Sequence, residues 1–186
     1  MKFGGSSMAE PGAMLKSAAI VKSHAGGNEL VVVCSAAGDV TDRLISLVEK
    51  AKRGRGDEVE KILGGMELLH RQLLEAVEDL RVREEVGAVV DQLLRELRRA
   101  VSGILYLREV TPRSMDYILS FGERLSTRIF AGILVSMGLK SQYLDGGEAG
   151  IVTDSSFGEA NPLMEVTRLN VRRKLTRLLD EGYIPV

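Results

Sequence analysis

Short continuous apolar runs alternate along this chain with long stretches of helical spacing. Leu30–Cys34 is an unbroken apolar run between glycine-containing segments, a pattern typical of a central strand in a parallel sheet covered by helices. Ser141–Asp145 and Gly182–Val186 predict two further strands. Apolar residues at helical spacing in Ala13–His24 predict a helix that leads into Leu30–Cys34. With Lys2 and Phe3 as the stub of a first strand, this order predicts a right-handed βαβ unit and an α/β fold.

The middle third of the chain has the pattern of two long amphipathic helices. Apolar residues recur at steps of three or four from Ile62 to Leu80, and again from Val86 to Ile104. The charged segment Arg81–Glu85 separates the two stripes. We therefore expect an antiparallel helical hairpin over about residues 57–108, inserted into the α/β frame, whose stripes serve packing.

Thr111 and Pro112 predict the start of another helix, with Thr111 as its N-cap. We expect it to run to Met137 and to end at Gly138. Its pattern places Glu123 among large apolar neighbours, and a carboxylate buried in this way is costly unless a cation or a ligand pairs with it. The alternative is a helix rotation of about one residue, which lets Glu123 reach water or pair with a nearby arginine. The pattern leaves both open.

Composition narrows the class of protein. The chain has 186 residues, of which 45% are hydrophobic, and its 25 basic side chains balance 26 acidic ones. These values predict a soluble globular chain with one substantial core and no basic footprint for nucleic acid. No apolar run approaches the roughly 20 residues of a membrane span, and the first residues lack a signal-peptide pattern. The single cysteine, Cys34, excludes an internal disulfide, so we expect a cytoplasmic protein.

Two histidines are the remaining candidates for metal chemistry. Neither His24 nor His70 has a Cys, His or carboxylate neighbour at metal-ligand spacing. We expect both to be solvated helix residues, and we predict no metal ligands in this chain.

The start of the chain combines residue types that bind phosphate. Lys2 offers a positive charge to phosphoryl oxygens, and Gly4 and Gly5 let backbone N–H groups approach an anion closely. The lysine precedes the glycines, unlike the order in a P-loop, where it follows them and opens a helix. By itself such a segment is more often an ordinary turn from strand to loop.

Four segments in a fixed order closely resemble the N-terminal part of aspartate kinases, which are members of the amino acid kinase family. They are Lys2–Ser7, Val33–Leu44, Ser120–Ser126 and Asp145–Asp154. The resemblance continues through Phe157 and Gly158 to Gly182–Val186, so it covers essentially the whole chain. It implies an αβα sandwich with a mostly parallel sheet, the fold of amino acid kinases and of carbamate kinase.

The resemblance also implies a reaction, the transfer of the ATP γ-phosphoryl group to the β-carboxylate of L-aspartate. This is the first step of lysine, threonine and methionine biosynthesis, and it implies ATP and Mg²⁺ as cofactors. The acceptor carboxylate has a reference pKa of about 3.9 and is ionised at neutral pH, so it needs no general base. Phosphoryl transfer then depends mainly on positioning and on neutralising negative charge.

Individual residues receive roles from the same resemblance. Lys2 is the expected catalytic residue, and the expected phosphate and ATP contacts are Lys2, Phe3, Gly4, Gly5 and Ser6. Thr41 and Glu123 are expected to bind the amino acid, with Glu123 meeting its ammonium group.

Three further substrate residues are expected around the crevice. Ser35 and Ala36 follow a predicted strand, where loops at the carboxyl ends of parallel strands form the ligand crevice. Asp154 is expected in the pocket wall, with the capping of a turn as its alternative role. Thr41 has a second role as the N-cap of a helix that begins near Asp42.

Aspartate kinases continue past the equivalent of Val186 into a nucleotide-binding half and, usually, regulatory domains. We therefore expect residues 1–186 to be the substrate-binding part of a truncated kinase domain, with little or no activity alone. The expected partners are L-aspartate and either a second copy, as a homodimer, or the complementary C-terminal half. We expect no nucleic-acid partner and no membrane partner.

Two alternatives belong to other functional classes. The first is a non-catalytic relative that serves as an interaction or oligomerisation module, but such a scaffold has no need to keep Lys2, Thr41 and Glu123. The second is a kinase for another acidic metabolite, such as N-acetylglutamate. An acylated amino group carries no charge for Glu123 to meet, so a free amino acid is favoured.

Overall fold

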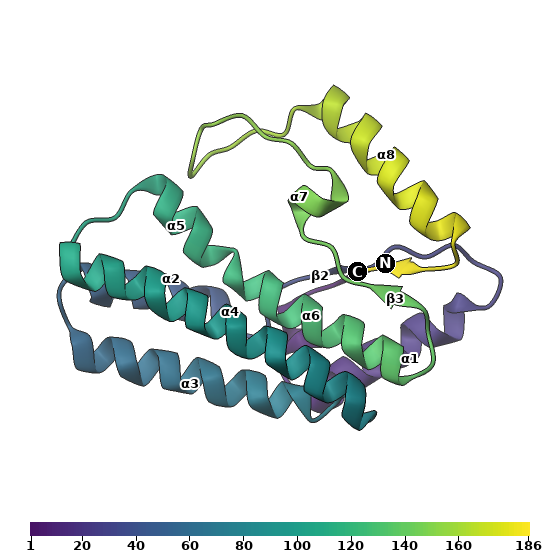
Figure 1. The fold of residues 1–186 in the computed structure, drawn as a ribbon, viewed down its shortest axis with the longest axis horizontal. Coiled ribbons are helices and arrows are strands. Elements are labelled where there is room, and N and C mark those ends of the chain that lie inside the picture. Colours follow the sequence, from purple (N-terminus) through teal and green to yellow (C-terminus); the bar gives the residue numbers. More distant parts are fainter.

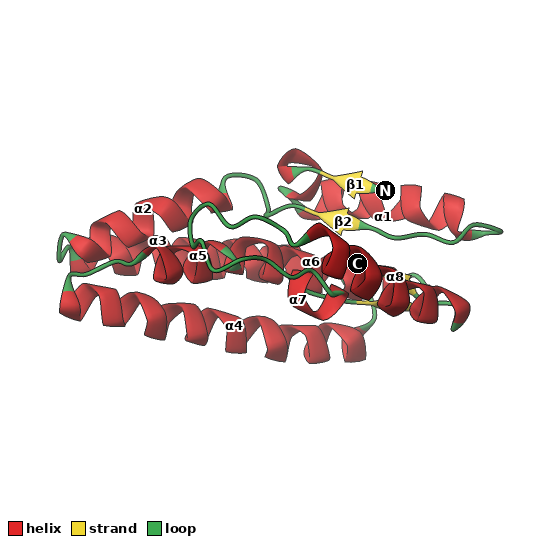
Figure 2. Ribbon diagram, turned by 90° about the horizontal axis from the view of Figure 1, so that it is seen from above, coloured by secondary structure: helices red, strands yellow, loops and turns green.

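The computed structural model describes all 186 residues and consists mainly of helices around a small sheet (Figures 1 and 2). In chain order the elements are β1 (Lys2–Phe3), the 3-10 helix η1 (Gly5–Met8), α1 (Pro11–Ala25), β2 (Val33–Cys34), α2 (Val40–Lys52), α3 (Gly56–Leu74), α4 (Leu80–Leu107), α5 (Pro112–Leu119), α6 (Phe121–Ser136), β3 (Ser141–Gln142), α7 (Gly146–Ala149), α8 (Met164–Asp180) and β4 (Ile184–Pro185).

The sheet is built from parallel pairs of short strands. β1 pairs with β2 and β3 pairs with β4, both in parallel. The N–H of Val32 donates to the carbonyl oxygen of Pro185 at 2.9 Å, so the two pairs lie edge to edge in the order β1–β2–β4–β3. The unit β1–α1–β2 is the predicted strand, helix and strand.

The strands are shorter than the apolar runs predict. The predicted strands Leu30–Cys34, Ser141–Asp145 and Gly182–Val186 each contain only two residues of regular strand. Residues beside the strands, such as Val32 and Val186, are buried all the same. Val33 of the run Leu30–Cys34 is an exception, because it is 56% exposed on a sheet face that the helices leave uncovered. An apolar run alone therefore fixes neither the burial of both faces nor the length of the strand.

Helices cover the two faces of the sheet unequally. On one face, α6 contacts β2 and β3, and α1 packs against α6. The helices α2, α3 and α4 extend this side into a larger helical body. On the other face lie only α7, α8 and the segment 150–163 that joins them (Figure 1). The arrangement is an αβα sandwich whose second helical layer is thin.

The core lies on the α6 side of the sheet. Phe121, Leu125, Ile129 and Phe130 of α6 are all fully buried. The ring of Phe130 lies 5.6 Å from the ring of Phe3, which packs β1 against α6. The apolar stripe that predicts this helix therefore faces the sheet as expected.

The two long helices of the middle third occupy nearly the predicted residues. α3 and α4 run antiparallel in Figure 1 and pack against each other. Their stripe residues Met66 and Leu97 are fully buried. Leu80, which we counted in the first stripe, is instead the first residue of α4 and is 68% exposed, because α3 already ends at Leu74.

The helix predicted from Pro112 to Met137 is wrong in one respect, because it is interrupted at Ser120 and divided into α5 and α6. The Ser120 hydroxyl donates to the carbonyl of Tyr117 at 2.7 Å, a local bond that competes with the regular helix. The predicted ends are confirmed. Thr111 is the N-cap, and Gly138 follows α6 with a φ of 82°, a conformation that favours glycine.

One histidine differs from expectation. His24 is exposed, but His70 is fully buried within α3, so its predicted exposure is wrong. Its Nδ1 lies 2.7 Å from the carbonyl oxygen of Met66, one turn earlier. This local bond lets an imidazole stand in the apolar stripe of a buried helix.

Candidate functional site

Loops that follow β1 and β2 meet at the carboxyl ends of these strands. The N–H of Ser35 donates to the carbonyl oxygen of Phe3 at 3.1 Å, and the N–H of Gly38 donates to that of Gly5 at 3.0 Å. The segments Lys2–Ser7 and Val33–Leu44, which the sequence singles out separately, therefore form one surface. Ligands bind at this edge of open α/β sheets.

Glycines let the backbone segments at this edge approach closely. A Cβ on Gly5 would lie 3.1 Å from the carbonyl oxygen of Gly38. A Cβ on Gly122, at the start of α6, would lie 2.9 Å from the Cβ of Ala36 and collide with it. The segment Ser120–Ser126 is thereby packed onto the loop after β2. The sequence gives Gly122 no role, since a close approach between distant segments leaves no local signal.

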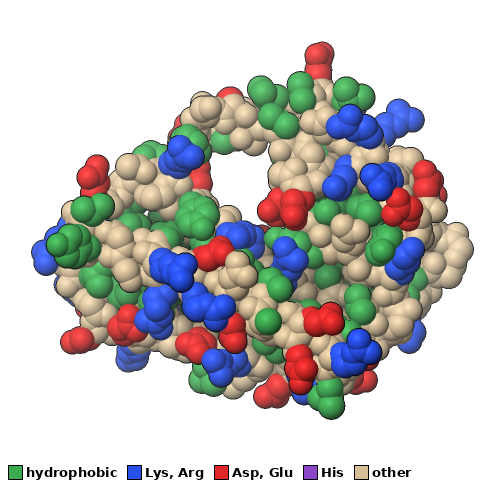
Figure 3. Space-filling view, in the orientation of Figure 1, with side chains coloured by type: hydrophobic (Ala, Val, Ile, Leu, Met, Phe, Trp, Pro, Cys, Tyr) green, Lys and Arg blue, Asp and Glu red, His purple; other side chains and the backbone are tan.

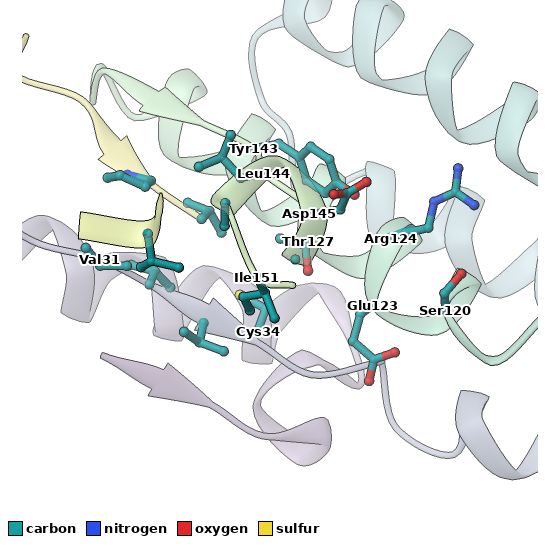
Figure 4. Close-up of a pocket in the computed structure, with 18 of the residues that line it drawn as sticks. Val31, Cys34, Ser120, Glu123, Arg124, Thr127, Tyr143, Leu144, Asp145 and Ile151 are labelled. Carbon is teal, nitrogen blue, oxygen red and sulfur yellow. The ribbon is translucent and has the colours of Figure 1, made fainter. Parts of the chain in front are cut away.

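Glu123 is exposed, so of the two alternatives that the pattern leaves open, the rotated helix is the one observed. α6 turns Leu125 and Ile129 into the core and leaves Glu123 at the surface of the pocket, as in the rotated alternative. Its Oε1 accepts a hydrogen bond from the N–H of Ala36 at 3.3 Å. In Figure 4 the carboxylate points toward the loop after β2 and away from Arg124.

Arg124 has partners of its own. Its guanidinium lies 4.6 Å from the ring centre of Phe121 and 3.4 Å from a carboxylate oxygen of Glu96. No ion pair in the structure joins Glu123 to an arginine. The Glu123 carboxylate therefore remains free to take a cation from a ligand.

A cavity of about 820 Å³ lies between the sheet, the α5–α6 junction, α7 and α8 (Figure 4). Its floor is apolar and includes Val31, Val33 and Ile151, and Val33 is 56% exposed. Its polar end contains Ser120, Glu123, Arg124 and Asp145. The apolar part is an uncovered sheet face, whereas the polar end has the groups that a small charged ligand needs.

Cys34 also lines this cavity and is buried, as expected of a small apolar residue at a strand end. Burial raises the pKa of its thiol to about 12. The thiol is therefore protonated at neutral pH and is a poor nucleophile.

The predicted phosphate segment forms an open surface around Lys2. Lys2 and Ser6 are exposed, and Phe3 is buried beneath them. The Nζ of Lys2 lies 3.6 Å from the position that a Cβ on Gly4 would occupy, so the amine stands over the glycine turn. No ion pair involves Lys2, which leaves its charge available to an anion.

Of the predicted substrate residues only Glu123 lines the cavity, and Ser35, Ala36, Thr41 and Asp154 lie outside it. Thr41 is exposed in the first turn of α2. Its predicted N-cap role is wrong, because the helix already begins at Val40 and Asp39 occupies the cap position. Because α2 begins before Thr41, the Thr41 hydroxyl does not cap the helix and lies on the surface.

Asp154 is half-buried, in the segment that joins α7 to α8. Its Oδ1 accepts hydrogen bonds from the N–H of Ser156 at 3.0 Å and the N–H of Asn161 at 3.1 Å. These two bonds, the Ser156 one foremost, lower the pKa of its carboxyl group. The geometry matches the turn-capping alternative for Asp154.

Metal-ligating side chains do not gather in this chain, because no three His, Cys, Asp or Glu residues stand close enough together to hold an ion. None of the helices has the length and apolarity that crossing a bilayer requires.

Comparisons with known proteins show the family of the chain. The family model described as "Amino acid kinase family" matches residues 1–186. The chain belongs to the amino acid kinase family. Among curated proteins, it is 35% identical over 180 residues to chloroplastic aspartokinase 3 of Arabidopsis thaliana and 29% identical over 189 residues to the lysine-sensitive aspartokinase 3 of Escherichia coli.

Solved structures of one amino acid kinase match nearly the whole chain. Escherichia coli aspartokinase III in complex with lysine and aspartate has a TM-score of 0.85 and 29% identity over 99% of this chain. The same enzyme with aspartate and ADP also has a TM-score of 0.85, at 27% identity over 99% of the chain. These matches confirm the amino acid kinase fold and the resemblance to aspartokinases.

This member of the amino acid kinase family corresponds to a part of its relatives' length. The matched region covers 94% of the chain but 30% of the Arabidopsis protein, and 98% of the chain but 40% of the Escherichia coli protein. In the solved structures it covers 39% of the larger chain.

Proposed function

We propose that this chain is the substrate-binding part of an aspartate kinase and that it binds L-aspartate at the polar end of the cavity. One observation carries the proposal: Glu123 is exposed into the cavity, at the place where the loops after β1 and β2 meet. The aspartate held by the similar Escherichia coli enzyme supports the choice of substrate.

Charge complementarity orients the amino acid in this proposal. The Glu123 carboxylate, which has no cationic partner in the chain, receives the α-ammonium group of L-aspartate. The substrate β-carboxylate then points toward the Lys2 side of the surface. It is ionised at neutral pH, so no residue has to remove a proton from it.

Lys2 is the residue proposed to act on the phosphoryl group. Its unpaired amine stands over Gly4, and the backbone around Gly4 and Gly5 is open to an anion. A fixed positive charge at this place lowers the energy of the transferring group as negative charge develops on its oxygens. Thr41, Ser35 and Ala36 are proposed to border the same surface.

ATP fits these residues only through its phosphates. Lys2 and the glycine turn suit phosphate oxygens, and ATP supplies the transferable phosphoryl group. No three His, Cys, Asp or Glu side chains meet in this chain to form an all-protein metal site. Mg²⁺ in phosphoryl transfer is usually held by one or two carboxylates together with the phosphates of ATP, so it would arrive with the nucleotide. We accordingly propose that the chain alone has little or no kinase activity and that residues 1–186 act with a complementary nucleotide-binding half or within a homodimer.

Calorimetric titration of the chain with L-aspartate tests the proposal. Glu123→Gln removes the charge that meets the ammonium group and should weaken binding by about 10- to 150-fold, the range for a hydrogen bond to a charged group. Glu49→Gln is the matched control, because Glu49 is an exposed glutamate on α2 without an ion pair.

Equal affinity in Glu123→Gln and wild type would contradict the role of Glu123. No heat of binding in the wild type would favour the interaction-module alternative. A parallel titration with Mg-ATP should give little or no heat, and tight binding would contradict the proposed division of the kinase.

A further inference from the structure

The peptide group between Ser35 and Ala36 is held at both ends by side chains of one helix. Its carbonyl oxygen, on Ser35, accepts a hydrogen bond from the Ser126 hydroxyl at 2.7 Å. Its N–H, on Ala36, donates to the Glu123 carboxylate at 3.3 Å. Glu123 and Ser126 are three residues apart on α6 and therefore lie on the same face of the helix.

The geometry of a trans peptide couples these two hydrogen bonds. The C=O and N–H of one peptide group are coplanar and point in opposite directions. When the Ser126 hydroxyl fixes the carbonyl, it also fixes the direction in which the Ala36 N–H points. The N–H is then aimed back along α6, toward the carboxylate of Glu123.

Burial makes the Ser126 contact hard to replace. Ser126 is fully buried, and its hydroxyl has a second, longer approach of 3.3 Å to the carbonyl oxygen of Glu123 in its own helix. A hydroxyl has one proton, and the bond to Ser35 is the shorter of the two. Without the hydroxyl, the Ser35 carbonyl oxygen loses its hydrogen-bond partner in a part-buried contact.

The close packing at Gly122 keeps this arrangement in register. Gly122 lies against Ala36 so closely that any side chain would collide with the Ala36 methyl group. α6 can therefore reach the loop with short side chains, and Ser126 is one of the shortest that carries a donor.

We propose that Ser126 is a positioning residue for substrate binding, which acts by holding the Ser35–Ala36 peptide so that its N–H fixes the Glu123 carboxylate. This inference rests on the proposed function, because the Glu123 carboxylate is the group that receives the ammonium of L-aspartate. Ser126 does not touch the substrate. Its effect is to stop the carboxylate from rotating away from the cavity.

A purely structural role for Ser126 makes a different prediction. If Ser126 only staples α6 to the loop, its removal lowers stability and leaves the selectivity of the folded protein unchanged. If Ser126 positions Glu123, its removal selectively weakens ligands that carry an ammonium group.

The matched control is Ser17→Ala. Ser17 is also a buried serine, 4% exposed, and its hydroxyl also donates to a backbone carbonyl, that of Ser7, at 3.2 Å. The same chemical change is thus made at two buried serines, of which one contacts the Ser35–Ala36 peptide. Should Ser126→Ala fail to fold, Ser126→Cys keeps the size of the side chain and a weaker donor, and it replaces the alanine variant.

The first experiment needs no ligand and uses the whole chain. The chemical shift of the Ala36 amide proton is followed by NMR as pH is lowered through the titration of Glu123. In the wild type and in Ser17→Ala the amide should report the protonation of its acceptor. In Ser126→Ala the amplitude should fall by at least half, and an undiminished amplitude would overturn the proposal.

The second experiment compares L-aspartate with succinate, the same dicarboxylate without an ammonium group. Ser126→Ala should reduce the preference for L-aspartate over succinate by about tenfold, the loss of one hydrogen bond that orients a charged group. Ser17→Ala should keep the wild-type preference, and adding Ser126→Ala to Glu123→Gln should cost little more than Glu123→Gln alone.

The outcomes distinguish a failure of the proposed function from a failure of the positioning role of Ser126. A wild type that binds neither ligand refutes the proposed function, while the NMR titration still decides whether Ser126 positions Glu123. A wild type that prefers L-aspartate, together with an unchanged preference in Ser126→Ala, refutes the positioning role and leaves the proposed function intact.

Discussion

The two faces of the sheet differ in how completely they are covered. On the helical face, α6 and α1 bury large side chains, and Phe121, Leu125, Ile129 and Phe130 have no exposed surface. On the opposite face, α7 and α8 leave Val33 56% exposed in the floor of the cavity. In Figure 3 the surface is open between the body of the molecule and the segment that joins α7 to α8.

In α6, the residues that pack on the sheet are distinct from the residues that face the open side. α6 presents its apolar side to the sheet, and the residues at its first turn face the loops where β1 and β2 end. Because the first turn is fixed by the packing of the rest of the helix, the Glu123 carboxylate stands on a rigid element at the edge of the open face. The closed face supplies the stability, and the open face supplies the accessible chemistry.

The largest effect should come from a deletion on the closed face. Phe130→Ala removes a fully buried ring that packs on Phe3 and should lower the free energy of unfolding by about 3–5 kcal/mol. Val33→Ala on the open face should change it by less than about 1 kcal/mol, because Val33 is 56% exposed. Urea unfolding followed by circular dichroism measures both. Similar losses in the two variants would mean that the faces do not differ in stability.

A smaller effect should come from the contact between α6 and the loop after β2. Gly122→Ala places a methyl group 2.9 Å from the Cβ of Ala36, and overpacking of this kind costs about 1–3 kcal/mol. Gly64→Ala is the control, since Gly64 is an exposed glycine inside α3 with no atom within 4 Å of its added Cβ.

The two glycine variants should move in opposite directions. Alanine is favoured over glycine in a helix interior, so Gly64→Ala should stabilise the protein by about 0.5–1 kcal/mol. Thermal unfolding measures both changes. A stabilising Gly122→Ala would show that the loop after β2 moves away freely. The claim that α6 and this loop hold Glu123 rigidly would then be contradicted.

Sequence patterns with a local cause were predicted well. The helical stripes in α3, α4 and α6 follow from periodic burial, and the end of α6 follows from a glycine with positive φ at Gly138. Two of the motif segments, Lys2–Ser7 and Val33–Leu44, meet at one edge of the sheet, and the roles of their residues remain predictions.

Features that depend on distant contacts were not predictable from the sequence. The exposure of Glu123 depends on the rotation of α6, which is set by its packing on the sheet and by the contact of Gly122 with Ala36. The hydrogen bond of Ser126 joins residues 91 positions apart. The predicted strand lengths were wrong for the same reason, since the length of each strand depends on the strand that pairs with it.

The helical side has one buried titratable group that should make its stability depend on pH. Burial in α3 lowers the pKa of His70 below its ordinary value of 6.5, and the nearby charge of Arg43 lowers it further, while the hydrogen bond to Met66 opposes both. Its Nε2 has no hydrogen-bond partner. The folded protein therefore holds His70 neutral at a pH where the unfolded chain already binds a proton.

The sign of the pH effect follows from this difference in proton binding. Above pH 6.5 both states hold a neutral imidazole, and the free energy of unfolding does not depend on His70. Below it the unfolded chain binds the proton first, so stability falls as the pH drops from 6.5 toward the lower pKa of the folded state. Urea unfolding near pH 7.5 and pH 5.5 should show this loss in the wild type. The control variant His24→Gln should show it too, because His24 is exposed in the folded protein. His70→Gln should lose part of the pH dependence. An unchanged dependence would mean that water reaches His70 in the folded protein. The helical face of the sheet would then be less completely covered than we infer.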